Sequence, residues 1–367
     1  MLMNGTQHKS CGQQGSALIL ALLIAAIVSL MSVRFAESFM LQLALTESQD
    51  DARLLAVYLS GAEQLAAQLL SADAASSQAD NIDHEQERWA QAVPLLPTDH
   101  GWLQVRISDA QSLFNLNNLG IKTAYSDDSG APLTVRFSPA QKQFVRLLQS
   151  FEDYPISEMD AVLMTEALID WIDEDDQTTG QGGAESLYYS SAGHSLVSSR
   201  GLVSSRGSMS PDSSIQAANQ AVFDISELYL IRHFTPGIVE RLRPWVVVLP
   251  EPTALNINTA PPKLLATMNQ PQILQPLAVN DVQTLLQFRQ AGVFANINDF
   301  FNSPDLQALL PAVETSSGST DAALYSVNSD WFQLHSAVSV NDRRSRWVSL
   351  LARSEQQTKV WERHRAY

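Results

Sequence analysis

The chain has few of the features that mark disulfide-rich proteins, nucleic-acid binders and common enzymes. It holds one cysteine, Cys11, in 367 residues, so no intramolecular disulfide can form. Lys and Arg number 23 against 39 Asp and Glu, and this net charge of −16 disfavours nucleic acid, whose phosphates require clustered basic residues. The sequence contains no Walker loop, Rossmann glycine pattern, His-Glu-x-x-His zinc motif or Gly-x-Ser-x-Gly elbow. We therefore expect no catalytic residues and no enzyme activity.

The first long apolar segment predicts a membrane anchor. Ser16 to Val33 contains no charge, proline or glycine. A helix of this length spans roughly 27 Å, which is sufficient to cross a bilayer core. A secretory signal has a shorter apolar region and a small-x-small cleavage site, which the following "MSVRFAES" does not provide. The preceding segment is short and weakly basic, which favours a cytoplasmic N-terminus.

The helical pattern continues beyond the anchor and becomes amphipathic. No proline or glycine interrupts the chain as far as Ser60. Apolar residues recur mostly three or four positions apart at Phe35, Phe39, Leu43, Leu54, Tyr58, Ala62, Leu65 and Leu69. The simplest interpretation is one long helix, and the alternative is an anchor followed by a separate helix. The apolar face needs a partner, so we predict partner contact along this helix, at Phe35, Phe39, Leu43, Leu54, Tyr58, Leu65 and Leu69.

A short polar leader that ends in glycine, an uncharged helix half and an amphipathic half together resemble type IV prepilins and pseudopilins. In that family a prepilin peptidase cuts after the glycine, which corresponds to Gly15 here. Ser16 would then be the first mature residue and would be N-methylated. Most members carry Glu at mature position five, where it neutralises the N-terminal amine of a neighbouring subunit, but this chain has Leu20. The lack of this Glu is typical of the minor pseudopilin K family of type II secretion systems.

Strand patterns lie at both ends of the remaining chain, and helical patterns lie between them. Strands are expected at 101–109 and 324–341, followed by a turn at Asp342–Ser345 and a strand at 346–354. Helix start signals occur at Ser138-Pro139 and at Ser157. The resemblance to the K family now covers nearly the whole chain, through the segments "FNLNNL", "ALIDWIDEDD", "GAESLYY", "FDISELYLI", "LNINTAPPKLLATM" and "WFQLHSAV".

The resemblance implies an α+β fold. In it, a pilin-like long N-terminal helix packs on a small antiparallel sheet, and a large all-α domain of the SAM or helix-hairpin-helix kind is inserted. The expected divisions are a cleaved leader (1–15), a transmembrane helix half (16–34), an amphipathic helix half (35–71), a linker with the first strands (72–118), the first part of the inserted α-domain with an acidic metal loop (119–240), a strand and connector (241–258), a second helical subdomain (259–320) and C-terminal strands (321–367).

The segment "DWIDEDDQTTGQGGAESLYY" indicates a cation site. It concentrates the carboxylates Asp170, Asp173, Glu174, Asp175, Asp176 and Glu185 around three glycines. Oxygen ligands at this density suit calcium. The loop is not an EF-hand, because Thr178 stands where the invariant glycine belongs and Glu185 falls one position late. The alternative is a solvated acidic helix end, although carboxylates there oppose the helix dipole. Members of the K family bind calcium through a loop of this kind, which implies one or two ions held by Asp173, Asp175, Asp176, Glu185 and Asn219.

The resemblance implies a minor pseudopilin at the tip of a periplasmic pseudopilus, in a complex with minor pseudopilins I and J. Pseudopilin H, the major pseudopilin G and the prepilin peptidase are further expected partners. The protein would cross the inner membrane once, with its N-terminus cytoplasmic and its soluble part periplasmic. One alternative is a membrane-anchored helix-hairpin-helix protein for DNA binding or uptake, but "LNINTAPPKLLATM" lacks the expected glycine-rich hairpin. The other is a membrane-tethered periplasmic hydrolase, which would require a convergent His, Asp and Ser cluster.

Overall fold

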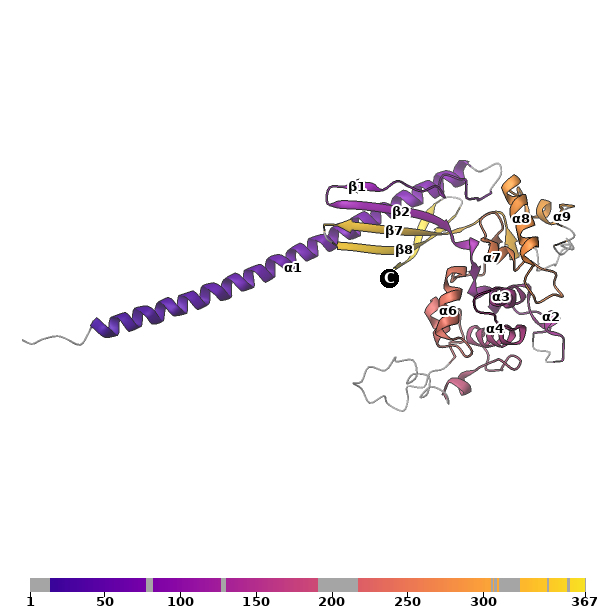
Figure 1. The fold of residues 1–367 in the computed structure, drawn as a ribbon, viewed down its shortest axis with the longest axis horizontal. Helices are drawn as coiled ribbons and strands as arrows, with labels where there is room; N and C mark the ends of the chain where they lie inside the picture. The colour runs from indigo at the N-terminus through magenta and orange to yellow at the C-terminus, as the bar shows by residue number, and fades with distance from the viewer. Residues whose placement is uncertain are drawn as a thin grey trace, which may run out of the picture.

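The chain forms a long helix, a five-stranded sheet and a helical head (Figure 1). The structure is a computed structural model that describes residues 14–76, 82–126, 130–190, 217–304, 306, 309, 324–341, 343–354 and 357–366. The predicted leader, 1–15, lies outside these ranges except for its last two residues. The mixture of elements confirms the α+β fold class.

Helix α1, Gln14–Ser76, is a single helix of 63 residues. It confirms one long helix rather than an anchor with a separate helix, and it continues five residues beyond the predicted end at 71. Ser16–Ala75 is long and apolar enough to cross a membrane by length and composition, and none of its most apolar window is buried in the protein. In Figure 1 the N-terminal part of α1 projects alone, and we call residues 14–47 the stalk.

The sheet joins strands from both ends of the soluble part. Its members are β1 (Leu96–Thr98), β2 (Gly101–Asp109), β7 (Trp331–Val340), β8 (Arg343–Arg353) and β9 (Thr358–Arg365). The order is β1-β2-β7-β8-β9, and every neighbouring pair is antiparallel. Strands at both ends were expected, but β9 was not.

The turn between β7 and β8 is tighter than the sequence predicts. Val340 pairs with Arg343, so the loop has two residues, 341 and 342, and the predicted turn at Asp342–Ser345 is wrong. Asn341 has φ 50°, in the left-handed region that asparagine tolerates better than most residues. The hairpin therefore needs no glycine.

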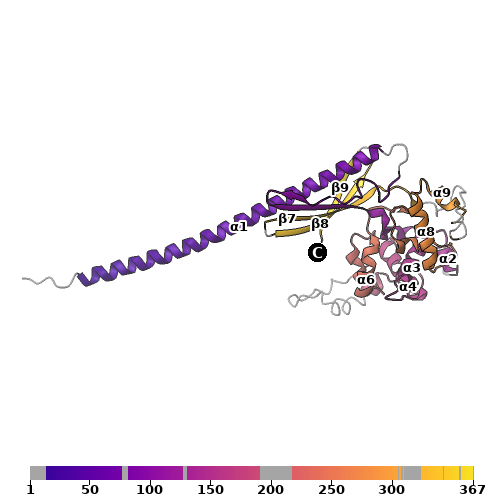
Figure 2. The same cartoon turned by 45° about the horizontal axis from the view of Figure 1, so that its top comes forward.

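The second half of α1 covers one face of the sheet (Figure 2). Side chains alternate between the two faces of a strand, and the apolar ones on this face meet small residues of the helix. This layer is formed by Ala62, Ala66, Leu70, Leu103, Val105, Ile107, Phe332, Leu334 and Val338. The alanines bring the helix axis close to the strands, so packing fixes where α1 leaves the sheet and becomes the stalk.

Glu63 is a buried charge in this helix–sheet layer, with 4% of its surface exposed. Its Oε1 accepts hydrogen bonds from Arg363 Nε at 2.8 Å and Ser349 Oγ at 2.7 Å, and its Oε2 accepts one from Arg363 Nη2 at 2.5 Å. These three bonds connect α1 to β8 and β9. They hold the exposed last strand onto a helix with which it shares little apolar contact.

The head is the chain between β2 and β7, and Figure 1 shows it at the end of the sheet opposite the stalk. Two of its helices begin where the sequence indicates. Ser138 caps α3 with a complete capping box, and the Ser157 side chain caps α4. The elements of the head are η1 (Ala110–Ser112), β3 (Phe114–Asn115), η2 (Leu116–Gly120), α2 (Leu133–Arg136), α3 (Pro139–Gln149), α4 (Glu158–Ile172), η3 (Ile225–Tyr229), α6 (Pro236–Leu242), η4 (Arg243–Trp245), β4 (Val246–Val247), β5 (Leu255–Asn256), α7 (Pro262–Leu265), α8 (Val279–Ala291), α9 (Ile297–Asn302) and β6 (Tyr325–Ser326).

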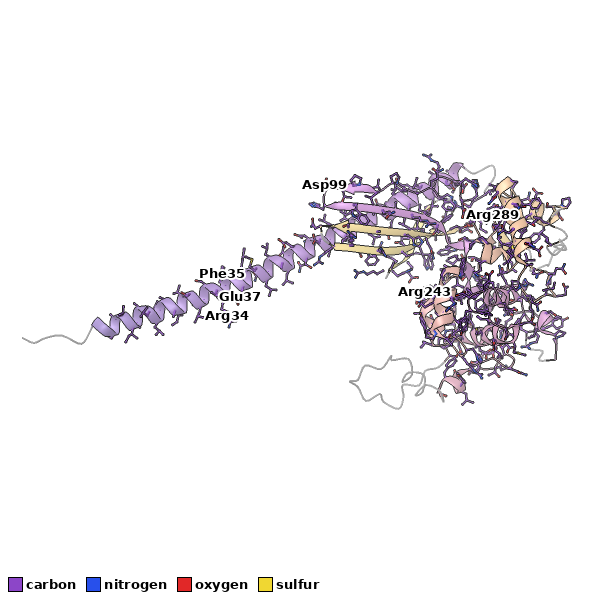
Figure 3. The ribbon with its side chains drawn as sticks, viewed as in Figure 1. Arg34, Phe35, Glu37, Asp99, Arg243 and Arg289 are labelled. Carbon is purple, nitrogen blue, oxygen red and sulfur yellow. The ribbon has the colours of Figure 1, made fainter. Side chains whose placement is uncertain are left out.

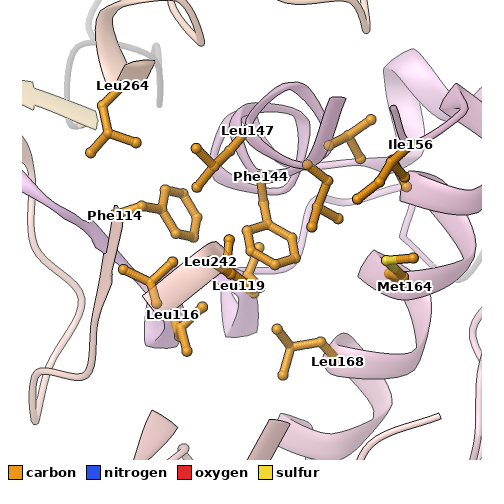
Figure 4. Packing of buried hydrophobic residues seen from close by; sticks show 14 of the residues in the cluster. Phe114, Leu116, Leu119, Phe144, Leu147, Ile156, Met164, Leu168, Leu242 and Leu264 are labelled. Atoms are coloured by element: carbon orange, nitrogen blue, oxygen red, sulfur yellow. The ribbon is translucent and has the colours of Figure 1, made fainter. Parts of the chain in front are cut away.

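The described helices of the head share a large hydrophobic core (Figure 4). Phe114, Phe144, Leu168, Leu242 and Leu264 all belong to it. These residues come from both sides of the divisions expected at 119, 241 and 259. The helical part therefore begins before residue 119, and the expected second subdomain shares its core with the first.

Asp109 is the junction between sheet and head. It ends β2 and is buried. Its Oδ2 accepts hydrogen bonds from Thr259 Oγ1 at 2.5 Å, Ser329 Oγ at 2.7 Å and Asn256 Nδ2 at 3.0 Å. Burial raises the pKa of Asp109 to about 6, although these hydroxyl groups oppose the rise. One carboxylate thus fixes two segments of the returning chain, at 256–259 and at Ser329, to the end of the sheet.

We predict that Glu63→Ala lowers the free energy of unfolding by about 2 kcal/mol, because it removes three charge-assisted hydrogen bonds from a buried layer. The measurement is thermal unfolding of the full chain in detergent, followed by circular dichroism. Glu37→Ala, on the exposed stalk, is the matched control and should change stability by less than about 0.5 kcal/mol. Equal destabilisation by the two variants would show that Glu63 does not hold the strand.

Candidate metal centre in the acidic loop

The loop that follows α4 returns tightly along the helix. A Cβ atom on Gly182 would lie 2.4 Å from the backbone of Leu163, and one on Gly183 would lie 2.4 Å from Asp170 Oδ2. Gly180 has φ 59°, which most side chains disfavour. The three glycines therefore allow this segment to press against α4.

Two buried carboxylates of α4 shape the loop through its backbone. Asp170 Oδ1 accepts a hydrogen bond from the Thr179 N–H at 2.9 Å. Glu166 Oε2 accepts from the N–H groups of Gln181 at 3.0 Å and Gly182 at 2.8 Å. The loop is thereby held in a fixed conformation by the last turns of the helix.

A carboxylate cluster is buried beneath this loop. Asp170, Asp173 and Glu185 are all buried, and each offers an oxygen within 4.8 Å of the others. Within the described residues, neither oxygen of Asp173 or Glu185, nor Oδ1 of Asn219, accepts a hydrogen bond. Lys122 Nζ lies 3.1 Å from Asp173 Oδ2, but this contact is an ion pair without hydrogen-bond geometry.

Apart from Asp173 Oδ2, which has its ion pair with Lys122, these oxygens are unusual because a buried acceptor without a partner costs about 1–3 kcal/mol. Asn219 lies beside the loop, where its Nδ2 donates to the Asp175 carbonyl at 3.2 Å. Its φ of 46° is again in the left-handed region. A hard cation is the kind of group that could satisfy carboxylate and amide oxygens together.

The pKa values of the cluster reflect excess negative charge. Burial raises the pKa of Asp173 to about 6, with Lys122 opposing the rise and Asp175 adding to it. Burial raises the pKa of Glu185 to about 7, and the charges of Asp170 and Asp173 add to that rise. Ionising the whole cluster near neutral pH is therefore unfavourable without a bound positive charge.

Only some of the five predicted ligands lie in the buried cluster. Asp173 and Glu185 lie in the buried cluster, and Asn219 lies at the edge of the loop. Asp175 instead pairs with Lys122 Nζ at 2.9 Å, and the exposed Asp176 accepts a hydrogen bond from Ser186 Oγ at 3.3 Å.

Asp170 was not among the predicted ligands. It precedes Asp173 by three residues, a spacing that places both on one helix face, and this was the available signal.

The predicted contact face of α1 is divided in two. Phe35, Phe39 and Leu43 lie on the stalk with 72%, 56% and 45% of their surface exposed, and Figure 3 shows Phe35 on this projecting segment. Leu54, Tyr58 and Leu69 are partly buried against the chain's own sheet, which corrects the expectation that the whole face is free for a partner. Leu65 is 36% exposed.

The predicted processing site lies at the start of α1. The helix begins at Gln14, so Gly15 and Ser16 belong to its first turn. Cleavage at this bond stays a prediction.

Comparison with known proteins gives one consistent result. Residues 112–251 and 255–318 match two family models described as protein K of the type II secretion system. The type II secretion system protein K of Klebsiella pneumoniae is 30% identical over 80% of this chain and 81% of its own length. The protein of that name from Pseudomonas aeruginosa is 29% identical over 94% of this chain and 90% of its own length.

A solved structure extends the similarity to the fold. A chain in the crystal structure of the GspK–GspI–GspJ complex, from the type 2 secretion system of enterotoxigenic Escherichia coli, superposes with a TM-score of 0.65. It is 26% identical, and the match covers 88% of this chain and 99% of that one. The chain described here belongs to the type II secretion system protein K family.

Proposed function

We propose that the protein is a minor pseudopilin at the tip of the periplasmic pseudopilus, where it initiates or caps the filament during secretion across the outer membrane. The observation that carries this proposal is the match over nearly the whole chain to a subunit of a GspK–GspI–GspJ complex. The partners would be the corresponding minor pseudopilins I and J. Family membership favours this function over the DNA-binding and hydrolase alternatives.

Two features of the chain support a place at the tip. Leu20 stands where most pilins have the Glu that neutralises the N-terminal amine of a neighbouring subunit, so contact with a further subunit lacks its usual charge pairing. The head also extends past the end of the sheet remote from the stalk (Figure 1). A subunit stacked above would have to occupy that space.

The stalk supports both membrane insertion and partner contact. Ser16–Val33 would lie in the inner membrane, with the N-terminus cytoplasmic and the head periplasmic, after cleavage by the prepilin peptidase. Phe35, Phe39 and Leu43 follow this span at four-residue steps and are exposed. An apolar stripe of this kind is expected to pack against the helices of neighbouring pseudopilins, including I and J and, lower in the filament, H or the major pseudopilin G.

The acidic loop would hold one structural calcium ion. Asp173 and Glu185, with Asn219, offer the five buried oxygens that lack hydrogen-bond partners, and this donor set fits calcium. Asp170 lies beside them, whereas Asp175 and Asp176 would have to leave Lys122 and Ser186 to reach the ion. Calcium would supply the missing positive charge and fix the returning chain to α4, without taking part in any reaction.

We predict that calcium raises the melting temperature of the full chain by about 5 °C when it is present at a hundredfold excess over its dissociation constant. Asp173→Asn should abolish most of this rise, because it removes a charged ligand. Asp99→Asn, an exposed change in the β1–β2 turn, should leave it intact. The measurement is differential scanning fluorimetry with calcium and with a chelator, and an unaltered rise in Asp173→Asn would refute the site.

The calcium effect should also depend on pH. The pKa values of Asp173 and Glu185 are raised, to about 6 and about 7, so their protonated forms stabilise the metal-free fold at low pH. This contribution is lost as pH rises through those values, and protons then no longer compete with the ion. The shift in melting temperature should therefore be small at about pH 5.5 and complete at about pH 8; a shift independent of pH would argue against these two ligands.

We predict that Phe39→Glu weakens co-purification of minor pseudopilins I and J with the full chain by at least about tenfold, since it places a charge in the apolar stripe. The matched control is Leu41→Glu, because Leu41 is also exposed on the stalk but lies on the opposite side of the helix. The measurement is quantitative recovery from detergent-solubilised membranes. Equal losses in the two variants, or none in either, would contradict contact through Phe35, Phe39 and Leu43.

A further inference from the structure

The C-terminal end of this acidic chain is basic. Residues 343–367 contain 7 of its 23 Lys and Arg but only 2 of its 39 Asp and Glu. The proposed tip function and the calcium site use none of these side chains. Their positions on the sheet indicate whether they could form a binding surface.

Strand register gathers part of this charge on the face that α1 does not cover. Leu103, Val105 and Ile107 of β2 face α1, so the intervening Arg106 faces away. Arg106 pairs with His335, and across the next strands Ala337 pairs with Arg346 and Ser339 with Arg344. The basic sheet face is defined here by Arg106, His335, Arg344, Arg346 and His364, all exposed.

This face contains a shallow hollow between its basic side chains. A hollow of about 180 Å³ is lined by Arg106, His335 and Arg346, among others. Within the described residues, none of Arg106, Arg344 and Arg346 has a carboxylate within 4.0 Å. Although the surface of His335 is exposed, the atoms packed around its ring partly desolvate it and lower its pKa, and the nearby charges of Arg106 and His364 lower the pKa further.

Three other arginines of these strands, on the α1 side of the sheet, are already engaged. Arg343 pairs with Asp51, Arg353 with Asp73 and Asp83, and Arg363 with Glu63. The contrast shows that the helix-side charges hold the fold together, whereas those on the outer face contribute little to it. An exposed, unpaired set of arginines is suited to binding carboxylates, because each guanidinium can donate two parallel hydrogen bonds.

The distance between the basic sheet face and the membrane favours a protein ligand over a lipid. Arg343 contacts Ser48 and Asp51 of α1, so the sheet begins at least 14 residues beyond Arg34. That length of helix is about 20 Å, and the Debye length at physiological ionic strength is about 8 Å. The half of the outer face nearer the head is covered by Val247 and Leu249, which pack on Trp331 and Leu350. The other half of the outer face is uncovered, and because it begins about 20 Å beyond Arg34 it lies beyond the electrostatic reach of lipid headgroups.

We propose that the basic sheet face binds an acidic segment of a partner protein, whose carboxylates pair with Arg106, Arg344 and Arg346. The face points away from α1, so its occupant does not compete with helices that pack on the stalk. It therefore provides a second interaction surface, separate from Phe35, Phe39 and Leu43.

The test uses the full chain in detergent and a fluorescein-labelled polyglutamate peptide of twelve residues. Fluorescence anisotropy should detect binding at low salt that weakens as salt increases. The triple variant R106E/R344E/R346E should weaken binding by at least about tenfold while leaving the melting temperature unchanged. Arg346→Glu and Arg88→Glu are matched single changes, because Arg88 is exposed but lies outside the basic sheet face, and only the first should weaken binding.

Several outcomes would overturn the proposal. Absence of peptide binding by the unmodified chain at low salt is one, and equal weakening by Arg346→Glu and Arg88→Glu is another, since it would reflect net charge alone. Binding to phosphatidylglycerol vesicles without binding to the peptide would assign the face to lipid. Sedimentation that shows a dimer lost in the triple variant would assign it to a second copy of the chain.

Discussion

The packing of α1 against the sheet is the interaction on which the rest of the molecule depends. The first part of this helix is apolar on every side, whereas its last part presents small residues to the sheet. Ala62 and Ala66 allow close approach, and the Glu63–Arg363 pair adds the directional contacts that hold β9. If this layer were loose, the stalk would have no fixed direction relative to the head, and a filament subunit requires one.

The head is positioned from this layer by a small number of buried polar groups. Asp109 ends strand β2 and binds Thr259, Ser329 and Asn256, all of which come from the returning chain. The acidic loop repeats this principle at the far end of the head, where Glu166 and Asp170 hold backbone N–H groups. The two sites differ in one respect. The Asp109 carboxylate is satisfied by protein donors, whereas Asp173 and Glu185 are not.

The sequence predicted those elements whose signals are local. The long helix follows from the lack of helix breakers between Ser16 and Ser60, and α3 and α4 begin at the serines that cap them. Strand β9 was missed because almost all of its side chains are exposed, so no half-buried alternation marks it.

Non-local features could not be predicted in the same way. A helical period identifies an apolar face but not what covers it, and so Leu54 and Tyr58, which pack on the chain's own sheet, could not be separated from Phe35. Charge density located the acidic loop, whereas the number of its carboxylates that are buried depends on tertiary packing.

The central claim is that α1 is a pseudopilin helix. It is cleaved at its start, is anchored in the membrane and assembles from there into a filament. The most direct test is mass spectrometry of the N-terminus of the membrane-extracted protein, with and without the prepilin peptidase. The account predicts a mature chain that begins with N-methylated Ser16 only when the peptidase is present. An intact Met1 in both strains, or a cut beyond Val33, would contradict it.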